Sequence, residues 1–199
     1  MGDEKRGGNL RDLLAVTVGV LIALMLDGAV GWAQDRMLVA EARDSISREV
    51  AENKDNLTQA LQGLAGRTED VGKVLQLIED LVATGKSDID DIQVGLSLAE
   101  LSRAAWETAN RTGALQHMGY EDVRGYARVY EFQERFINHQ SGSVRDISAA
   151  IALIHGDPRE LSRDDLMLLR QALHRIRADF IVQRQLGDGL LHAYSGVGQ

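Results

Sequence analysis

A run of apolar residues near the N-terminus constrains this chain more than any other feature. Residues 13–33 read LLAVTVGVLIALMLDGAVGWA, with Thr17 and Asp27 as polar interruptions. As a helix rising 1.5 Å per residue, the run is about 31 Å long, close to the thickness of a bilayer's hydrocarbon core. Trp32 lies where membrane helices often carry an interfacial aromatic residue. The sequence therefore predicts a transmembrane anchor at residues 13–33, after a short cytoplasmic N-terminus at residues 1–12.

Two alternatives compete with the anchor. A cleaved signal peptide also has a basic start and an apolar middle, and Gly31-Trp32-Ala33 offers a small-x-small cleavage site. The run is also compatible with the buried core helix of a soluble protein. The anchor is favoured because helix-compatible sequence continues from Trp32 through Asn56 without a proline or a glycine. If the segment were cleaved after Ala33, the mature N-terminus would begin in the middle of a helix, which argues against a signal peptide.

Basic residues on either side of the run predict its orientation. Lys5, Arg6 and Arg11 precede it, whereas Arg36 and Arg43 follow it. The side with more basic residues usually stays in the cytoplasm. We therefore expect a single-pass protein of the bacterial inner membrane whose domain lies in the periplasm. The signal-peptide alternative leads to the same compartment.

Small residues recur at every fourth position of the anchor. The stripe consists of Ala15, Gly19, Ala23, Asp27 and Gly31. Small side chains at this spacing let two membrane helices approach closely, and an aspartate in the stripe can hydrogen-bond across the contact. The stripe predicts a homodimer formed through the anchor. Alternatively, glycine and alanine are simply common in membrane helices.

The remainder of the chain predicts an all-α domain. Pro158 is the one proline in 199 residues, so little interrupts long helices, and 44% of the residues are apolar, which is enough for a core. Apolar residues recur at helical spacing, and no stretch alternates convincingly with a period of two. We predict that the anchor continues into a helical bundle of four or five long helices over residues 34–195, with a frayed tail at 196–199.

Local patterns divide this domain into elements. An amphipathic helix over 35–64 continues the anchor, Gly63 and Gly66 suggest a turn, and a second helix over 68–84 would complete an antiparallel hairpin. A capping box at 87–90 predicts a third helix that ends near Asn110. A short helical turn at 114–118 follows.

From Tyr120 an apolar 3-4 spacing continues for more than thirty residues. Ser141-Gly142-Ser143 lies within it and predicts a kink or a break. The last helix has two candidate caps, one at 157–160 and one at 162–165, and is expected to reach Leu191.

Patterns typical of enzymes and metal sites are missing or incomplete. Gly66 and the pair Gly72-Lys73 have the wrong spacing for a phosphate-binding loop, and Val74 replaces the hydroxyl residue that would hold magnesium. The five histidines never lie three or four residues apart, and there is no cysteine. A net charge of −8 argues against a nucleic-acid partner. We therefore expect no catalytic residues, no metal ligands and no cofactor.

Aromatic and polar side chains concentrate in one region of the sequence. They suggest a small-ligand pocket between helices, lined by Trp106, Arg111, His117, Tyr120, Arg124, Tyr126 and Tyr130. The alternative is ordinary core packing where several helices meet.

Two stretches resemble a broad family of uncharacterised bacterial membrane proteins with one N-terminal transmembrane helix and a helical domain. One is residues 19–24, GVLIAL, followed by an acidic or amide residue and a tryptophan. The other runs from Trp106-Glu107-Thr108-Ala109 through Gly113-Ala114-Leu115 to Tyr126 and Tyr130. Trp32 follows Asp27 by five residues here, where the family has about two. The resemblance implies the membrane topology and no activity.

These observations lead to two functional hypotheses. The first is a membrane-tethered helical scaffold that binds the lipid bilayer through its anchor and holds an unknown protein partner. The second is an extracytoplasmic bundle that senses a small ligand and acts through a partner, since the chain has no second predicted span.

Overall fold

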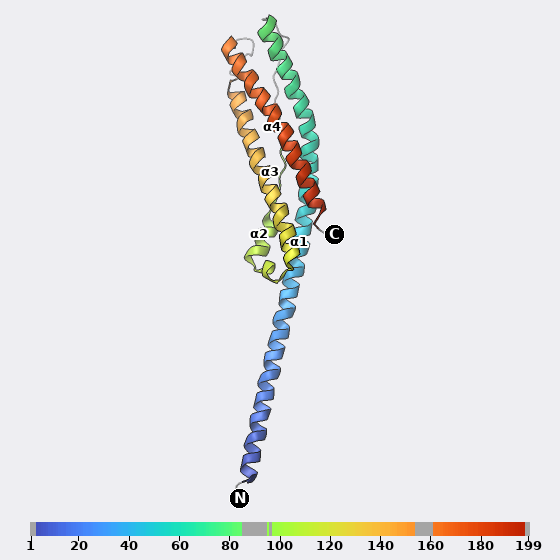
Figure 1. Ribbon diagram of the computed structural model, residues 1–199, viewed down its shortest axis with the longest axis vertical. Helices are drawn as coiled ribbons and strands as arrows, with labels where there is room; N and C mark the ends of the chain where they lie inside the picture. The colour runs from blue at the N-terminus through green and yellow to red at the C-terminus, as the bar shows by residue number, and fades with distance from the viewer. Residues whose placement is uncertain (1–2, 85–94, 96, 154–160, 198–199) are drawn as a thin grey trace.

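The computed structural model describes residues 3–84, 95, 97–153 and 161–197, with side chains from residue 14 onward. These residues form α1 (Asp3–Thr84), α2 (Ala104–Arg111), the 3-10 helix η1 (Ala114–His117), α3 (Tyr120–Leu153) and α4 (Arg163–Ser195). Figure 1 shows α1 running the length of the molecule, with its distal half packed beside α4, which in turn lies against α3. An all-α fold in which a long apolar N-terminal helix leads into a bundle is confirmed.

The expected hairpin at Gly63 and Gly66 is wrong, because both glycines lie inside α1. An interior glycine costs a helix only about 1 kcal/mol relative to alanine. That cost is offset by an apolar stripe that continues past both glycines and is buried in the bundle. The stripe includes Leu57, Leu61, Leu64, Val71, Leu75 and Ile78. As one helix, α1 is about 120 Å long at 1.5 Å per residue.

The expected third helix is also wrong over most of its described length. Residues 97–103 are not helical, and α2 begins only at Ala104. We call residues 97–103 the strap, because they run between α1 and α3 and are hydrogen-bonded to both. The capping box expected at 87–90 lies outside the described residues. Gly63 is needed where the strap passes, since a Cβ there would lie 2.4 Å from Ser97 Oγ.

Gly113 is the glycine that does mark a turn. Its φ of 80° is in the left-handed region, which glycine adopts without steric cost, and it separates α2 from η1. The helical turn expected at 114–118 is thereby confirmed as η1.

Helix α3 passes through Ser141-Gly142-Ser143 without a break. The hydroxyls of Ser141 and Ser143 donate to the carbonyl oxygens one turn earlier, so both find their partners within the helix. At the start of α4, Ser162 and Asp165 form a capping box, as predicted for 162–165. The alternative cap at 157–160 lies outside the described residues. Helix α4 ends at Ser195, beyond the expected Leu191, and Val197 packs against the core.

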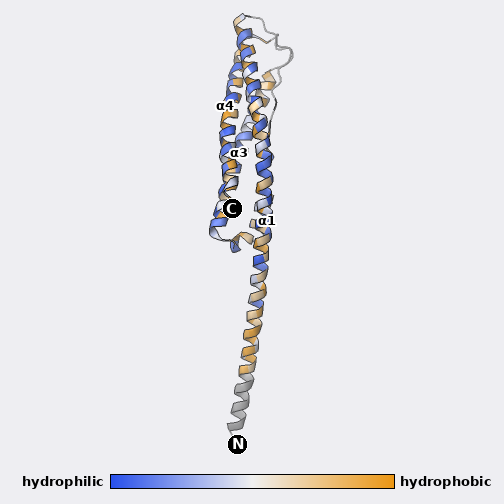
Figure 2. Ribbon diagram, turned by 90° about the vertical axis from the view of Figure 1, so that its right-hand side faces the viewer, coloured by the Kyte–Doolittle hydropathy of each residue, from blue (hydrophilic) through white to orange (hydrophobic). Residues whose placement is uncertain are grey.

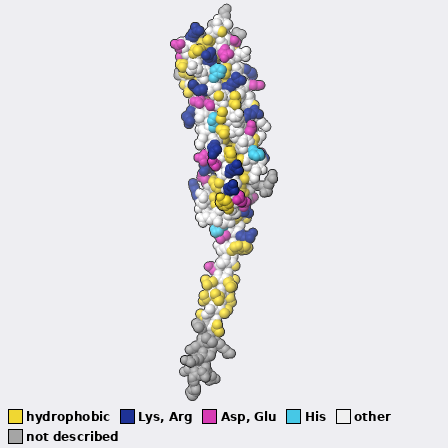
Figure 3. Space-filling model, in the orientation of Figure 1, with side chains coloured by type: hydrophobic (Ala, Val, Ile, Leu, Met, Phe, Trp, Pro, Cys, Tyr) yellow, Lys and Arg dark blue, Asp and Glu magenta, His cyan; other side chains and the backbone are white. Residues whose placement is uncertain are grey.

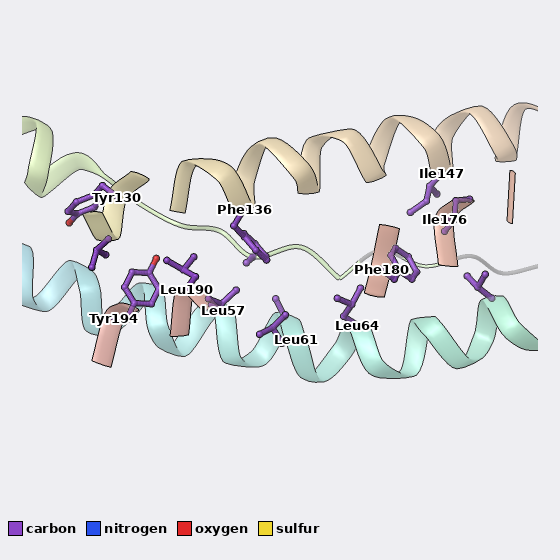
Figure 4. Close-up of a cluster of buried hydrophobic side chains, with 14 of the residues drawn as sticks. Leu57, Leu61, Leu64, Tyr130, Phe136, Ile147, Ile176, Phe180, Leu190 and Tyr194 are labelled. Atoms are coloured by element: carbon purple, nitrogen blue, oxygen red, sulfur yellow. The ribbon is translucent and has the colours of Figure 1, made fainter. Parts of the chain in front are cut away.

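The core lies between α1, α3 and α4 (Figure 4). Helix α4 runs antiparallel to both of the others and packs against each (Figure 1). Phe136, Leu173 and Leu190 are fully buried there. Gly187 permits the close approach of α4 to α1, since a Cβ at this position would lie 2.6 Å from Leu61 Cδ2.

Candidate functional site

The apolar segment of α1, residues 14–33, projects beyond the bundle. Figure 2 shows it as a continuous hydrophobic stretch, and Figure 3 shows apolar side chains around the stalk below the bundle. Its large side chains are half or more exposed, from Leu21 at 50% to Met25 at 72%. Among the described residues, α1 is the one helix long and apolar enough to cross a membrane. So much contiguous apolar surface indicates a region covered by lipid or protein.

The small-residue stripe lies entirely on this projecting segment. Gly19 and Gly31 have nothing within 4 Å of the position a Cβ would take. Ala15, Ala23 and Asp27 are exposed. The stripe therefore has room for a second helix, and pairing through it stays a prediction.

Three of the seven residues expected to line a pocket come together. The ring of Trp106 on α2 stacks on that of Tyr130 on α3, with centroids 5.3 Å apart and planes 20° apart. Tyr126, one turn earlier on α3, lies 6.5 Å from Trp106 at a tilt of 52°. Such ring pairs add about 0.5–1.5 kcal/mol to the burial of their surface. The rings therefore pack α2 against α3.

The other four residues lie at the surface. Arg111 pairs with Glu107 on its own helix at 3.5 Å, and Arg124 pairs with Glu121 at 3.4 Å. Tyr120 is 76% exposed. His117 Nδ1 lies 3.3 Å from Asp35 Oδ2 on α1, at the base of the bundle. The seven residues are therefore divided between a packed aromatic cluster and separate surface positions.

Glu49 on α1 is the buried ionisable residue at the centre of this region, and the sequence analysis missed it. Its Oε1 accepts a hydrogen bond from the Tyr130 hydroxyl at 2.6 Å. Its Oε2 accepts from the Ser102 hydroxyl at 2.6 Å and from the Ala105 N–H at 2.9 Å. Its burial could have been inferred from the sequence, because Glu49 lies one turn after Ile46 on the apolar face of α1.

These contacts set the charge state of the cluster. Burial acts to raise the pKa of Glu49, but hydrogen bonds from Ser102, Tyr130 and the backbone N–H groups of 105 and 106 outweigh it and lower that pKa. Burial and the neighbouring Glu49 raise the pKa of Tyr130. Burial and the charge of Glu49 likewise raise the pKa of Tyr194. The cluster is thus an ionised carboxylate held by neutral donors.

Side-chain amides bind the strap through its backbone. The Asn53 amide on α1 donates to the Ser102 carbonyl at 2.7 Å and accepts from the Ser102 N–H at 2.7 Å. On α3, Gln140 makes the same pair of bonds with Ala99, at 3.1 and 2.9 Å. Because an extended segment has no internal hydrogen bonds, its buried backbone groups need such partners. The amides therefore let an extended segment lie within a helical bundle.

Gln133 links this strap to α4. Its Nε2 donates to the Ser102 carbonyl at 2.8 Å, while its Oε1 accepts from the Tyr194 hydroxyl at 2.7 Å. Among the described residues, every buried side-chain nitrogen and oxygen has a hydrogen-bond partner. The polar layer formed by Glu49, Asn53, Gln133, Gln140 and the strap is thus satisfied from within.

The described chain combines a projecting apolar helix with a bundle whose buried polar groups bind one another. Comparisons with protein-family models, with curated proteins and with solved structures find no match to it.

A carboxylate pair between α3 and α4 leads to a stability prediction. Burial, a hydrogen bond with Asp146 and the charge of Asp146 raise the pKa of Asp179. The Asp179 carboxyl therefore binds a proton more readily in the folded protein than in the unfolded chain. As the pH rises through the raised pKa, Asp179 ionises and the folded protein loses stability. Asp179→Asn is expected to raise the thermal midpoint at pH 7, and the gain should shrink as the pH falls towards 3.8, the ordinary value.

Asp188→Asn is the matched control, because Asp188 lies exposed on the same helix. Asp188→Asn should leave the thermal midpoint unchanged, as measured by circular dichroism at pH 7 and at pH 3.8. A lower midpoint for Asp179→Asn at pH 7 would mean that attraction to His139 and Arg175 outweighs the repulsion from Asp146.

Proposed function

We propose that this protein is a membrane-tethered helical scaffold. Helix α1 crosses the bacterial inner membrane once, and the bundle stands on the periplasmic side, where it holds a protein partner. The observation that carries the proposal is the exposure of residues 14–33 on a helix whose distal half is buried in the bundle.

The chemistry along this segment supports a bilayer as its surroundings. Apolar residues such as Leu21 and Ile22 each favour insertion by about 0.3–0.6 kcal/mol at the centre of a membrane helix. Asp27 lies close to the end of the segment, where an acidic side chain can reach the interface. Trp32 stands at that end with the Arg36 guanidinium 4.9 Å above its ring, an arrangement suited to the headgroup layer.

The continuity of α1 supports a scaffold role. No break separates residues 14–33 from the residues that form the core, so the bundle would be held at a fixed height above the bilayer. The greater number of basic residues before the apolar run supports a cytoplasmic N-terminus and a periplasmic bundle. The aromatic rings contact one another, and Tyr130 contacts Glu49, which favours a scaffold over the ligand-sensing alternative.

Fractionation of the full-length chain with a C-terminal epitope tag tests the tether. The unprocessed chain should stay in the membrane pellet after an alkaline carbonate wash. Protease added to intact spheroplasts should remove the tag. A soluble full-length product would refute the tether, cleavage after Ala33 would establish a signal peptide, and a protected tag would reverse the orientation.

Purification in a mild detergent separates the two functional hypotheses. A scaffold should retain a protein in a fixed stoichiometric ratio, visible by quantitative mass spectrometry. A small molecule retained in place of a protein would support the sensing alternative.

A further inference from the structure

A cleft lies where the apolar segment of α1 meets the base of the bundle. Its volume is about 450 Å³, and residues of α1 and of η1 line it. The α1 residues are Trp32, Asp35, Arg36, Val39, Ala40 and Arg43, and η1 contributes His117. Figure 3 shows charged side chains and a histidine gathered at this junction. The lining is thus polar directly beside an apolar surface.

The position of this cleft along α1 determines its level relative to the bilayer. Arg36 follows Trp32 by one turn, a rise of about 6 Å. The headgroup layer of each leaflet is roughly 5–8 Å thick, from a bilayer of 40–45 Å with a 30 Å core. If Trp32 marks the edge of the hydrocarbon, Arg36 and the lower part of the cleft lie level with the lipid phosphates. This step rests on the proposed tether.

The charges in the cleft leave one cation without an acidic partner. Asp35 Oδ2 lies 3.3 Å from His117 Nδ1, a contact that is an ion pair when the imidazole is protonated, and Arg43 is paired with Asp122 on α3. No carboxylate of the described chain lies within ion-pair distance of Arg36, whose guanidinium carbon lies 4.9 Å from the centre of the Trp32 ring. A cation–π contact with one ring does not use up the five N–H donors of a guanidinium, so Arg36 keeps donors for an anion.

We propose that this cleft binds the phosphate headgroup of an anionic bilayer lipid, with Arg36 as the phosphate ligand. The planar guanidinium matches two oxygens of a phosphodiester, and such charge-assisted bonds are the stronger class. Trp32 faces the glycerol and upper acyl chain. A headgroup with a net negative charge is preferred over a zwitterionic one, because the phosphate of a zwitterionic headgroup is already neutralised by its own ammonium group.

Native mass spectrometry of the full-length protein in a neutral detergent tests the site. The protein is incubated with equal amounts of phosphatidylglycerol and phosphatidylcholine that carry the same acyl chains. The wild type should retain phosphatidylglycerol about tenfold over phosphatidylcholine, the factor that a charge-assisted hydrogen bond of about 1.5 kcal/mol provides. Arg36→Gln should lose this preference, and Arg36→Lys should keep part of it.

Arg48→Gln is the matched control. Arg48 is an exposed arginine on the same helix, paired with Asp44 at 2.9 Å and outside the cleft. It should retain phosphatidylglycerol as the wild type does. Inorganic phosphate at the same concentration should not displace the lipid.

The outcomes separate this proposal from the tether on which it rests. Reconstitution of wild type and Arg36→Gln into lipid vesicles reports the tether: failure of both to insert overturns the proposed function. Insertion of both with equal retention of the two lipids overturns the headgroup site alone. Equal loss of preference in Arg48→Gln would indicate nonspecific attraction, and displacement by inorganic phosphate would indicate a site for soluble anions. Either result overturns the lipid site.

Discussion

The double variant Val20→Arg, Leu24→Arg is expected to abolish retention of the full-length chain in carbonate-washed membranes. Both residues lie near the middle of the apolar segment and are 53% and 63% exposed, so they make no contact with the bundle core. An arginine at the centre of a membrane helix costs about 2.5–3.5 kcal/mol, so two cost roughly 6 kcal/mol. The variant should move to the soluble or aggregated fraction, measured by immunoblotting.

A matched control uses exposed apolar residues of the bundle. Leu168 and Val182 on α4 are 50% and 42% exposed. The double variant Leu168→Arg, Val182→Arg adds the same charge and should stay in the pellet. Retention of the Val20 and Leu24 variant would contradict a lipid environment for residues 14–33.

Glu49→Ala is expected to destabilise the bundle by about 2–4 kcal/mol, the cost of leaving buried donors without an acceptor. The Tyr130 hydroxyl and the Ala105 N–H lose their partner, and the junction of α1, α2 and α3 loses its central contact. Glu49→Gln keeps an acceptor oxygen and should cost less. Urea unfolding followed by tryptophan fluorescence measures the change, since Trp106 stacks on Tyr130.

The stabilisation that the Glu49 carboxylate provides should decrease as the pH falls. The pKa of Glu49 is lowered in the folded protein from an ordinary 4.5, so the unfolded chain takes up this proton first as the pH falls. The stabilisation is complete above pH 4.5 and is lost as the pH falls through the lower folded pKa. The difference between wild type and Glu49→Gln should therefore narrow below pH 4.5.

Glu52→Gln provides the control for this experiment, because Glu52 is exposed on α1. It should unfold like the wild type at neutral pH. A Glu49→Ala variant as stable as the wild type would show that water replaces the carboxylate without cost.

The glycines show how a tertiary contact outweighs a local preference for turns. Gly63, Gly66 and Gly113 carry the same local preference for turns, yet only Gly113 has a positive φ. Gly63 lies within α1 at the point where the strap passes against it, and the strap comes from more than thirty residues further along the chain. The local sequence holds no information about that neighbour.

The partners of the polar layer at the candidate site were likewise not predictable from the local sequence. Glu49 and Asn53 interrupt the apolar stripe of α1, which indicates that they have special partners. Those partners, Ser102 and Tyr130, lie about fifty and eighty residues away in sequence. The clustering of aromatic residues around Tyr130 is visible in the sequence, but their mutual stacking is not predictable from it, because the stacking depends on where α2 begins.

The sequence by itself determined what local chemistry controls: the apolar run near the N-terminus, the helical class, the apolar periodicity of α3 and α4, and residues 162–165 as one of two candidate caps. These depend on residues a few positions apart, whose spacing decides which face is apolar and where a helix begins. Only the tertiary structure decided that α1 continues past Gly63, that residues 97–103 are extended, and that Glu49 is buried. Each of these depends on a partner distant in sequence that supplies packing or a hydrogen bond, and such a partner outweighs the weak local preference.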